Sequence, residues 1–137
     1  MANVINIKNK KAWHDFEIIE KFIAGMQLQG TEIKSIRMGK ASLADSYCHF
    51  VNGELFVKNM QIAEYNWGTH YNHLPGRERK LLMTRRELKK LEKQVKERGL
   101  TIVTLRLFIS DKGYAKLEIA LASGKREYDK REDLKKK

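Results

Sequence analysis

The sequence has few of the residues that build disulfides and force turns. It contains one cysteine, Cys48, and one proline, Pro75, in 137 residues. A single cysteine excludes an internal disulfide and is typical of a reducing compartment such as the cytoplasm. Because Cys48 lies in a strand-like run, we interpret it as a buried, unreactive thiol.

Motifs of metal binding and catalysis are also scarce. His70 and His73 are spaced three apart, but no C-x-x-C or H-E-x-x-H accompanies them to complete a zinc site. No G-x-S-x-G and no phosphate-cradling glycine loop occurs. We therefore expect no metal, no cofactor and no catalytic residue.

Long hydrophobic runs are missing as well. No stretch approaches the roughly 18 apolar residues of a membrane-spanning helix. Residues 1–13 have no apolar core followed by a small-residue cleavage site. The sequence thus predicts a cytoplasmic protein without a membrane partner.

Positive charge is what the chain has in excess. Lysine and arginine number 28 against 17 acidic residues, which gives a formal net charge of +11. So large an excess favours a polyanionic partner, and of the two candidates, nucleic acid and an anionic membrane surface, we predict nucleic acid. The length fits a single domain with a proper core.

The hydrophobic pattern predicts a mainly β protein. Strand-like runs cover residues 16–28, 47–51, 54–60, 103–109 and 115–121. Asn52-Gly53 between two such runs is a strong hairpin signal, because both residues accept positive φ. Gly25 within the first run suggests a bulge or bend.

Two helices interrupt these strands. The first is expected at residues 32–38, with Thr31 as N-cap, Glu32 in the first turn and Gly39 at the stop. Its Ile33 and Ile36 form a narrow apolar stripe that we assign to the core.

The second helix is expected at residues 85–98. Thr84 and Glu87 form a T-x-x-E capping box, and Gly99 supplies the stop. Because acidic residues are interleaved with its many cations, its charged side is interpreted as a solvated outer face.

Taken together, the elements predict an OB-like antiparallel β-barrel with two or three helices, a fold that binds polynucleotides across a strand face. We divide the chain into a basic N-terminal arm (1–15), the barrel (16–122) and a flexible basic tail (123–137). That tail contains seven basic and four acidic residues and no apolar period.

The long loop at residues 61–80 points to RNA. It places Tyr65, Trp67 and Tyr71 before the cations Arg77 and Arg79. Aromatic rings stack on unpaired bases while cations neutralise phosphates. For Trp67, stacking on a base and capping one end of the barrel are equally weighted interpretations.

Two other functions stay open at this level. One is a general OB-type RNA binder, which would bind unstructured oligonucleotides as tightly as a folded RNA. The other is an RNA-processing enzyme that uses His70, His73 and a nearby acid.

Five motifs in unbroken order closely resemble small protein B, the family that binds transfer-messenger RNA (the SsrA RNA, or tmRNA). They are NKKAWHDFEI, GTEIKSIRMGKASLADSY, the NGE hairpin, NHLPGRERKLLM and GKREYDKRE. The resemblance runs from about Asn9 to the C-terminus. It implies an OB-type barrel with helices, in agreement with the hydrophobic pattern.

The resemblance also implies a mechanism in trans-translation, the rescue of stalled ribosomes. The protein binds the tRNA-like domain of the RNA in place of its missing anticodon arm. It helps to deliver that domain, with elongation factor Tu, to the empty A site, where ribosomal RNA surrounds it. Peptide tagging for degradation follows.

Site residues follow from the motif matches and from the charge pattern. The predicted RNA-binding residues are Asn9, Lys10, Lys11, His14, Glu32, Lys34, Arg37, Arg77, Arg79, Lys80 and Leu82. The residues that match the tail segment at the ribosomal decoding centre are Tyr128, Asp129, Lys130 and Arg131.

Three departures from the family pattern stand out. Ile23 occupies a position that often carries a glutamate linked to RNA binding, and Tyr128 replaces the histidine of some members. Members also usually continue beyond the position of Lys137 with a further basic stretch. We expect RNA binding to persist without that stretch and tagging to be weak.

Overall fold

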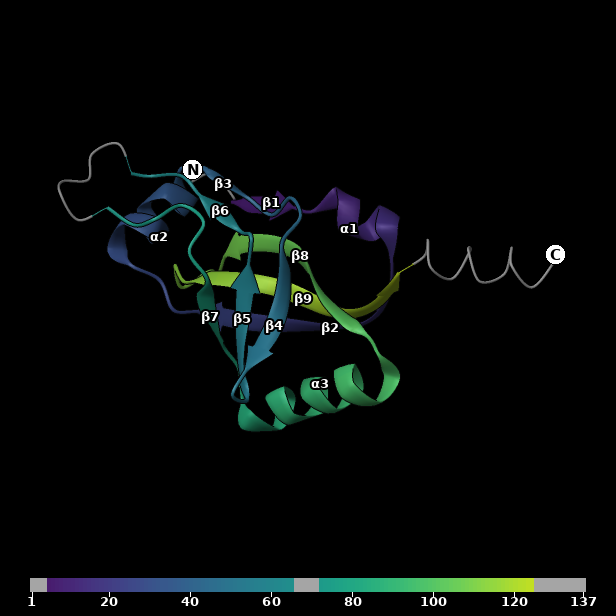
Figure 1. The fold of residues 1–137 in the computed structure, drawn as a ribbon. Coiled ribbons are helices and arrows are strands. Elements are labelled where there is room, and N and C mark those ends of the chain that lie inside the picture. Colours follow the sequence, from purple (N-terminus) through teal and green to yellow (C-terminus); the bar gives the residue numbers. More distant parts are fainter. Residues whose placement is uncertain (1–4, 66–71, 125–137) are drawn as a thin grey trace.

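The computed structural model describes residues 5–65 and 72–124 as a β-barrel with three helices (Figure 1). The helices are α1 (Lys10–Asp15), α2 (Gly30–Arg37) and α3 (Arg85–Arg98). The strands are β1 (Asn6–Lys8), β2 (Phe16–Met26), β3 (Ala41–Ser42), β4 (Tyr47–Val51), β5 (Glu54–Lys58), β6 (Gln61–Ile62), β7 (Arg79–Leu82), β8 (Thr101–Ile109) and β9 (Ala115–Gly124). The predicted antiparallel barrel is confirmed.

The barrel closes because β8 pairs on both of its edges. The main sheet runs β1-β8-β4-β5-β7-β2-β9, and an additional pairing joins β8 to β9. One edge of β8 is shared between β4 at residues 102–103 and β1 at residues 106–108. Every pairing is antiparallel.

The expected N-terminal arm is part of this fold from Asn6 onward. Strand β1 pairs with β8, and α1 packs over a small cluster on the outside of β8 and β9. Ala12 of α1 is buried there beside Val103 and Leu105. A register shift between Thr104 and Arg106 explains this second cluster, because it turns Leu105 away from the barrel interior.

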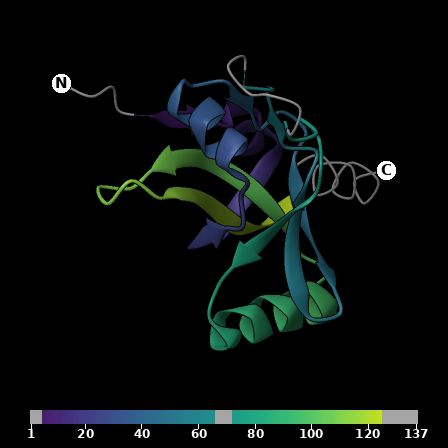
Figure 2. The same cartoon turned by 90° about the vertical axis from the view of Figure 1, so that its left-hand side faces the viewer.

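The main core fills the barrel and is covered by α2 and α3. Ile36 of α2 and Leu91 of α3 are fully buried in it, together with Leu55, Leu107 and Leu117 from the strands. Figure 2 shows α3 below the barrel and α2 above it. The assignment of Ile36 to the core is confirmed, and Ile33 packs against the same cluster from a partly exposed position.

Local signals placed the hairpin and α3 correctly. Asn52 and Gly53 both have positive φ, at 52° and 80°. The Thr84 and Glu87 side chains form the expected capping box, and Gly99 ends α3 in the left-handed conformation with φ 64°. Left-handed geometry favours glycine because it has no Cβ.

Two details of the prediction are wrong. Helix α2 begins at Gly30, and its N-cap is Gln29 rather than Thr31. Gln29 and Glu32 form a reciprocal capping box, so the Thr31 hydroxyl is free to bond elsewhere. The irregularity in β2 lies between Ile18 and Glu20, whereas Gly25 pairs regularly with β7 and β9.

The long loop predicted at residues 61–80 begins with strand β6 and ends within strand β7. β6 pairs with β3 to form a small second sheet near α2, and β7 completes the barrel between β5 and β2. Trp67, His70 and Tyr71, as well as the tail residues Tyr128, Asp129, Lys130 and Arg131, lie outside the described residues.

Candidate nucleic-acid interface

Glu32 is the centre of a buried ionic cluster. Its carboxylate accepts hydrogen bonds from Arg77 Nη2 at 2.6 Å, from Arg77 Nε at 3.0 Å and from Arg79 Nε. The Gln29 backbone N–H donates to the same carboxylate at 2.7 Å. Glu32 and Arg79 are both completely buried. Two cations and a helix N-terminus thus compensate the charge of one carboxylate.

Burial alone would raise the pKa of Glu32. Hydrogen bonds from Arg77, from the Gln29 backbone and from Arg79 outweigh that effect, and the pKa falls below its ordinary value of 4.5. Burial also lowers the pKa of Arg79, and the Glu32 carboxylate offsets part of the shift. Both side chains remain charged. The lowered pKa of Glu32 favours its ionised form, and Arg79 keeps its proton even after such a shift.

Arg79 orders the segment that leads into β7. Its guanidinium donates to the carbonyls of Met60 at 2.8 Å, Arg77 at 2.9 Å and Pro75 at 3.0 Å. These partners lie on either side of the undescribed residues 66–71. Glu32 and Arg79 therefore cannot reach RNA directly in this conformation, and they hold α2 and the loop in position.

His73 belongs to the same buried region. One ring nitrogen, Nδ1, lies 2.8 Å from the Thr31 hydroxyl, and Nε2 lies 2.9 Å from the Ile62 carbonyl. With 2 % of its surface exposed, it joins α2 to β6. Neither ring nitrogen is left for a substrate.

Asn9 is also buried and holds α1 against the barrel. Its side-chain amide donates to the Thr104 carbonyl at 3.0 Å and to the Thr104 hydroxyl at 3.1 Å. That hydroxyl contacts Ser46 Oγ at 2.5 Å, which links the segment before β4 to the same network. Lys10, Lys11 and His14 of α1 are exposed.

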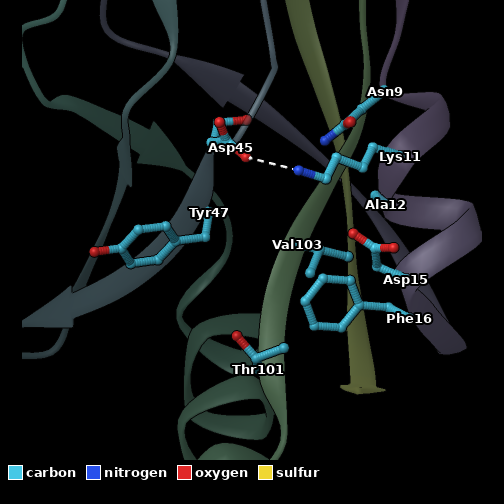
Figure 3. Close-up of a pocket in the computed structure, with 10 residues that line it drawn as sticks. Asn9, Lys11, Ala12, Asp15, Phe16, Asp45, Tyr47, Thr101 and Val103 are labelled. Carbon is cyan, nitrogen blue, oxygen red and sulfur yellow. Dashed lines mark hydrogen bonds and ion pairs between the residues drawn. The ribbon is translucent and has the colours of Figure 1, made fainter. Parts of the chain in front are cut away.

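A pocket of about 400 Å³ lies between α1, β4 and β8 (Figure 3). Lys11 bridges to Asp45 at 3.4 Å, while Phe16 and Val103 supply apolar walls. Figure 3 shows the Tyr47 ring directed away from α1. The acids Asp15 and Asp45 in its lining make it a poor receptor for phosphate.

An exposed strip of apolar and basic side chains follows the outer face of β2. Lys21 and Ile23 point outward, since residues alternate between the two faces of a strand, and Ile19, the unpaired residue of the irregularity, is exposed as well. The Lys21 ammonium lies 4.7 Å from the centre of the Trp13 ring of α1, at one end. Leu82 of β7 lies beside Gly25 at the other end. We call these residues, from Trp13 to Leu82, the β2 strip.

The β2 strip ends in a groove of about 440 Å³ between α2, β2, β7 and the β8–β9 turn. Leu82 and Ile33 are among its apolar lining residues, and Arg37 and Lys116 are among its cations. Tyr114, 66 % exposed, stands at its edge. Exposed rings, aliphatic side chains and cations at one place are suited to unpaired bases and phosphates.

Comparison with known proteins decides the family. A family model described as "SmpB protein" matches residues 6–137. The chain belongs to the SmpB protein family. The SsrA-binding protein of Phocaeicola vulgatus is 62 % identical over 133 residues, which cover 97 % of this chain and 89 % of that protein. The SsrA-binding protein of Geotalea uraniireducens is 51 % identical over 137 residues, covering all of this chain and 90 % of that one.

A solved structure agrees with this assignment to the SmpB family. It is described as "tmRNA-SmpB: a journey to the center of the bacterial ribosome", and the matched chain has a TM-score of 0.73 at 43 % identity. The match covers 88 % of this chain and 85 % of that chain. The resemblance stated from the motifs is confirmed.

The structure brings most of the predicted site residues of this SmpB family member together in three groups. Glu32, Arg77 and Arg79 come together in the buried cluster, and Arg37 and Leu82 meet at the groove. The exposed cations of α1 lie beside Trp13 at the other end of the β2 strip. Lys34 and Lys80 lie apart from these groups: Lys34 Nζ is 5.5 Å from the centre of the Tyr65 ring, and Lys80 pairs with Glu54 at 3.0 Å.

Sequence reasoning missed several residues of this candidate interface. Trp13, Lys21, Tyr114 and Lys116 were not among the predicted site residues, although all four lie on the β2 strip or the groove. Period-two alternation in β2 marks Lys21 as outward, and that signal was available. No signal in the sequence places Tyr114 near Leu82, because their proximity depends on how β9 and β7 flank β2.

No metal or membrane feature was found in the part of the chain that the structure describes. Within residues 5–65 and 72–124, no group of three or more His, Cys, Asp or Glu side chains is placed to hold a metal ion. Among the same residues, no helix has the length and hydrophobicity needed to cross a bilayer. Burial raises the pKa of the Cys48 thiol, which keeps it protonated.

Proposed function

We propose that this protein binds the tRNA-like domain of transfer-messenger RNA and acts with it in trans-translation. The β2 strip with its groove carries the proposal, because it combines exposed rings, aliphatic side chains and cations on one face of the barrel. Relatives named SsrA-binding protein, at 62 % and 51 % identity, support it. The excess positive charge of +11 supplies the long-range attraction to RNA.

In this mechanism the barrel is a rigid platform, and each part has a separate role. Lys10, Lys11 and His14 of α1 and Arg37 of α2 contact phosphates at the two ends of the strip. Leu82 and Tyr114 pack against bases or riboses in the groove beside Arg37. The buried Glu32, Arg77 and Arg79 cluster positions α2 and thereby the groove.

Delivery to the ribosome is the second half of the proposal. The bound RNA domain enters the empty A site, with elongation factor Tu held through the RNA. Tyr128, Asp129, Lys130 and Arg131 contact the decoding centre, as the motif match implies. Strand β9 ends at Gly124 opposite Phe16, so the chain leaves the barrel beside α1.

A competition assay separates this function from a general OB-type binder. Labelled tRNA-like RNA is bound to the protein and displaced by unlabelled tRNA-like RNA or by an unstructured oligonucleotide of equal length. We expect the folded RNA to compete far more strongly. Equal competition would refute the proposal in favour of a general single-strand binder.

The groove is tested by removing its exposed ring. Tyr114→Ala should weaken binding of the tRNA-like RNA by the loss of one stacking contact, worth about 1–3 kcal/mol. Tyr47→Ala removes an exposed ring of β4 that does not line the groove and serves as the matched control. An equal effect of the two substitutions would show that the groove is not the interface.

The alternative of an RNA-processing enzyme has little support in the described residues. It relied on His70 and His73, and His73 is buried with both ring nitrogens engaged. A His70→Ala, His73→Ala double variant tests it, with RNA turnover as the readout. RNA turnover by the unmodified chain that is lost in the variant would support the hypothesis of an RNA-processing enzyme.

A further inference from the structure

Helix α3 presents a strongly cationic outer side. Leu88, Leu91 and Val95 face the core. At about 100° per residue, the opposite side of the helix carries six exposed cations and a single acid, Glu97. The cations are Arg85, Arg86, Lys89, Lys90, Lys93 and Lys96.

The acids of α3 neutralise only part of this side. Glu87 is engaged in the N-terminal cap with Thr84. Glu92 lies 3.9 Å from Lys96, and Lys90 Nζ bonds Glu20 of β2 at 2.7 Å. Within the described residues, Arg85, Arg86, Lys89 and Lys93 form no ion pair. Of the acids interleaved in the sequence of α3, Glu97 therefore lies on the cationic side and Glu92 pairs with Lys96 beside it, so cations outnumber acids there.

This cationic side begins where the β2 strip ends. Leu82 of the strip precedes the N-cap Thr84 by two residues, and a hollow of about 550 Å³ is lined by Leu82, Arg85 and Lys89 among others. The Lys90–Glu20 ion pair holds α3 against β2, the strand that carries the strip. In Figure 1, α3 runs along the end of the barrel beneath β2.

We propose that α3 extends the RNA interface and contacts the phosphate backbone of the same tRNA-like RNA that the β2 strip holds. This inference rests on the proposed function. An RNA helix presents two backbones to a protein surface, and contacts to both are the usual way in which double-stranded RNA is bound. The β2 strip takes the bases and one backbone, and the α3 cations take the other.

Position and chemistry favour RNA over a membrane as the partner of α3. A membrane-surface helix needs an exposed apolar side beside its cations. In α3 the apolar side is buried in the barrel core, and the outer side carries no apolar residue. Lys89 and Lys93 lie one turn apart, a rise of roughly 6 Å, so that successive cations can meet successive phosphates.

The test is the triple variant Arg86→Gln, Lys89→Gln, Lys93→Gln. These three side chains are exposed and have no ion pair to lose, and glutamine is a good helix former. We expect weaker binding of the tRNA-like RNA and a salt dependence (log K against log salt) that is shallower by about 2–3 units. Circular dichroism and the unfolding midpoint should be unchanged.

A matched control has the same change in net charge. Lys8→Gln, Lys40→Gln, Lys58→Gln removes three exposed cations on β1, before β3 and at the end of β5, which Figure 1 places away from α3. It should keep the salt slope of the unmodified chain. An equal loss in the control would overturn the proposal, because net charge alone would then account for the effect.

A second probe keeps this inference separate from the proposed function. Binding of a plain RNA duplex is measured in parallel with binding of the tRNA-like RNA. Binding to isolated ribosomes is measured as the third ligand. If the triple variant has unchanged salt slopes on both RNAs, the α3 contact alone is refuted. A loss of binding seen only with ribosomes would refute it too. A chain that does not prefer the tRNA-like RNA, but whose duplex slope falls in the triple variant, would refute the proposed function and retain the α3 contact.

Discussion

At the scale of single residues, the most consequential polar groups are buried. Glu32 joins two arginines and a helix N-terminus, and Arg79 in turn binds the carbonyls of Met60, Pro75 and Arg77. A buried carboxylate of this kind stabilises the fold only as long as its partners remain. Its contribution to RNA binding is indirect, through the position of α2 and the groove.

Glu32→Gln should strongly destabilise the protein. It leaves Arg79 charged and buried without a counter-charge, which costs roughly 3–5 kcal/mol. Glu54→Gln is the control, because it removes a carboxylate from the exposed pair with Lys80 and should cost less than about 1 kcal/mol. Urea unfolding measures both, and equal losses would contradict the assigned role.

The pH dependence of stability gives an independent readout of the same cluster. The pKa of Glu32 is lower in the folded than in the unfolded chain, so its stabilisation is complete above the ordinary value of 4.5. It is lost as the pH falls through the lower folded pKa. The difference in unfolding free energy between the unmodified chain and Glu32→Gln should therefore shrink in acid. A difference that stays constant would contradict the lowered pKa.

At the scale of elements, α1 shows how a short helix is held in place. Six residues are too few to form a stable helix alone in water. Ala12 packs on β8 and β9, and the Asn9 amide bonds Thr104. The exposed cations of α1 are thus presented on a fixed surface rather than on a loose arm.

Substitutions in α1 should separate support from RNA contact. Asn9→Ala leaves the Thr104 carbonyl without its side-chain donor and should cost about 1–3 kcal/mol of stability. Lys10→Gln, Lys11→Gln should leave stability within about 0.5 kcal/mol. It should also lower the salt slope of RNA binding by about 1–2 units.

Thermal unfolding and RNA titration at several salt concentrations make this comparison. An unchanged slope combined with weaker binding in the double lysine variant would mean that the two lysines act structurally. A fully stable Asn9→Ala variant would show that the Asn9–Thr104 contact contributes nothing.

At the scale of the whole molecule, we expect RNA binding and ribosomal function to separate along the chain. The β2 strip, the groove and α3 all lie before Gly124, the last residue of β9. Deletion of residues 125–137 should leave affinity for the tRNA-like RNA nearly intact. The same deletion should abolish peptide tagging on stalled ribosomes, because the motif match assigns Tyr128–Arg131 to the decoding centre.

RNA affinity and tagging should be measured on the same preparations of the two chains. Loss of RNA binding on deletion would refute the division of roles. Efficient tagging by the shortened chain would refute the assignment of residues 128–131 to the decoding centre.

The elements whose signals are local could be predicted from the sequence. The Asn52-Gly53 turn, the α3 capping box and its Gly99 stop are each fixed by neighbouring residues, and all three are confirmed. Strand alternation likewise predicted β8 and β9. The family was also readable, because its motifs are short continuous segments.

Which polar residues are buried and which cations remain without an ion pair depends on contacts between distant segments. Glu32 and Arg79 are 47 positions apart, and Asn9 and Thr104 are 95 apart, so that no local pattern reports their contact. The N-cap of α2 shifted to Gln29 because Glu32 could bond its backbone N–H while also meeting two arginines. The free cations of α3 likewise emerge only when the helix is docked, because docking decides which acids are already engaged.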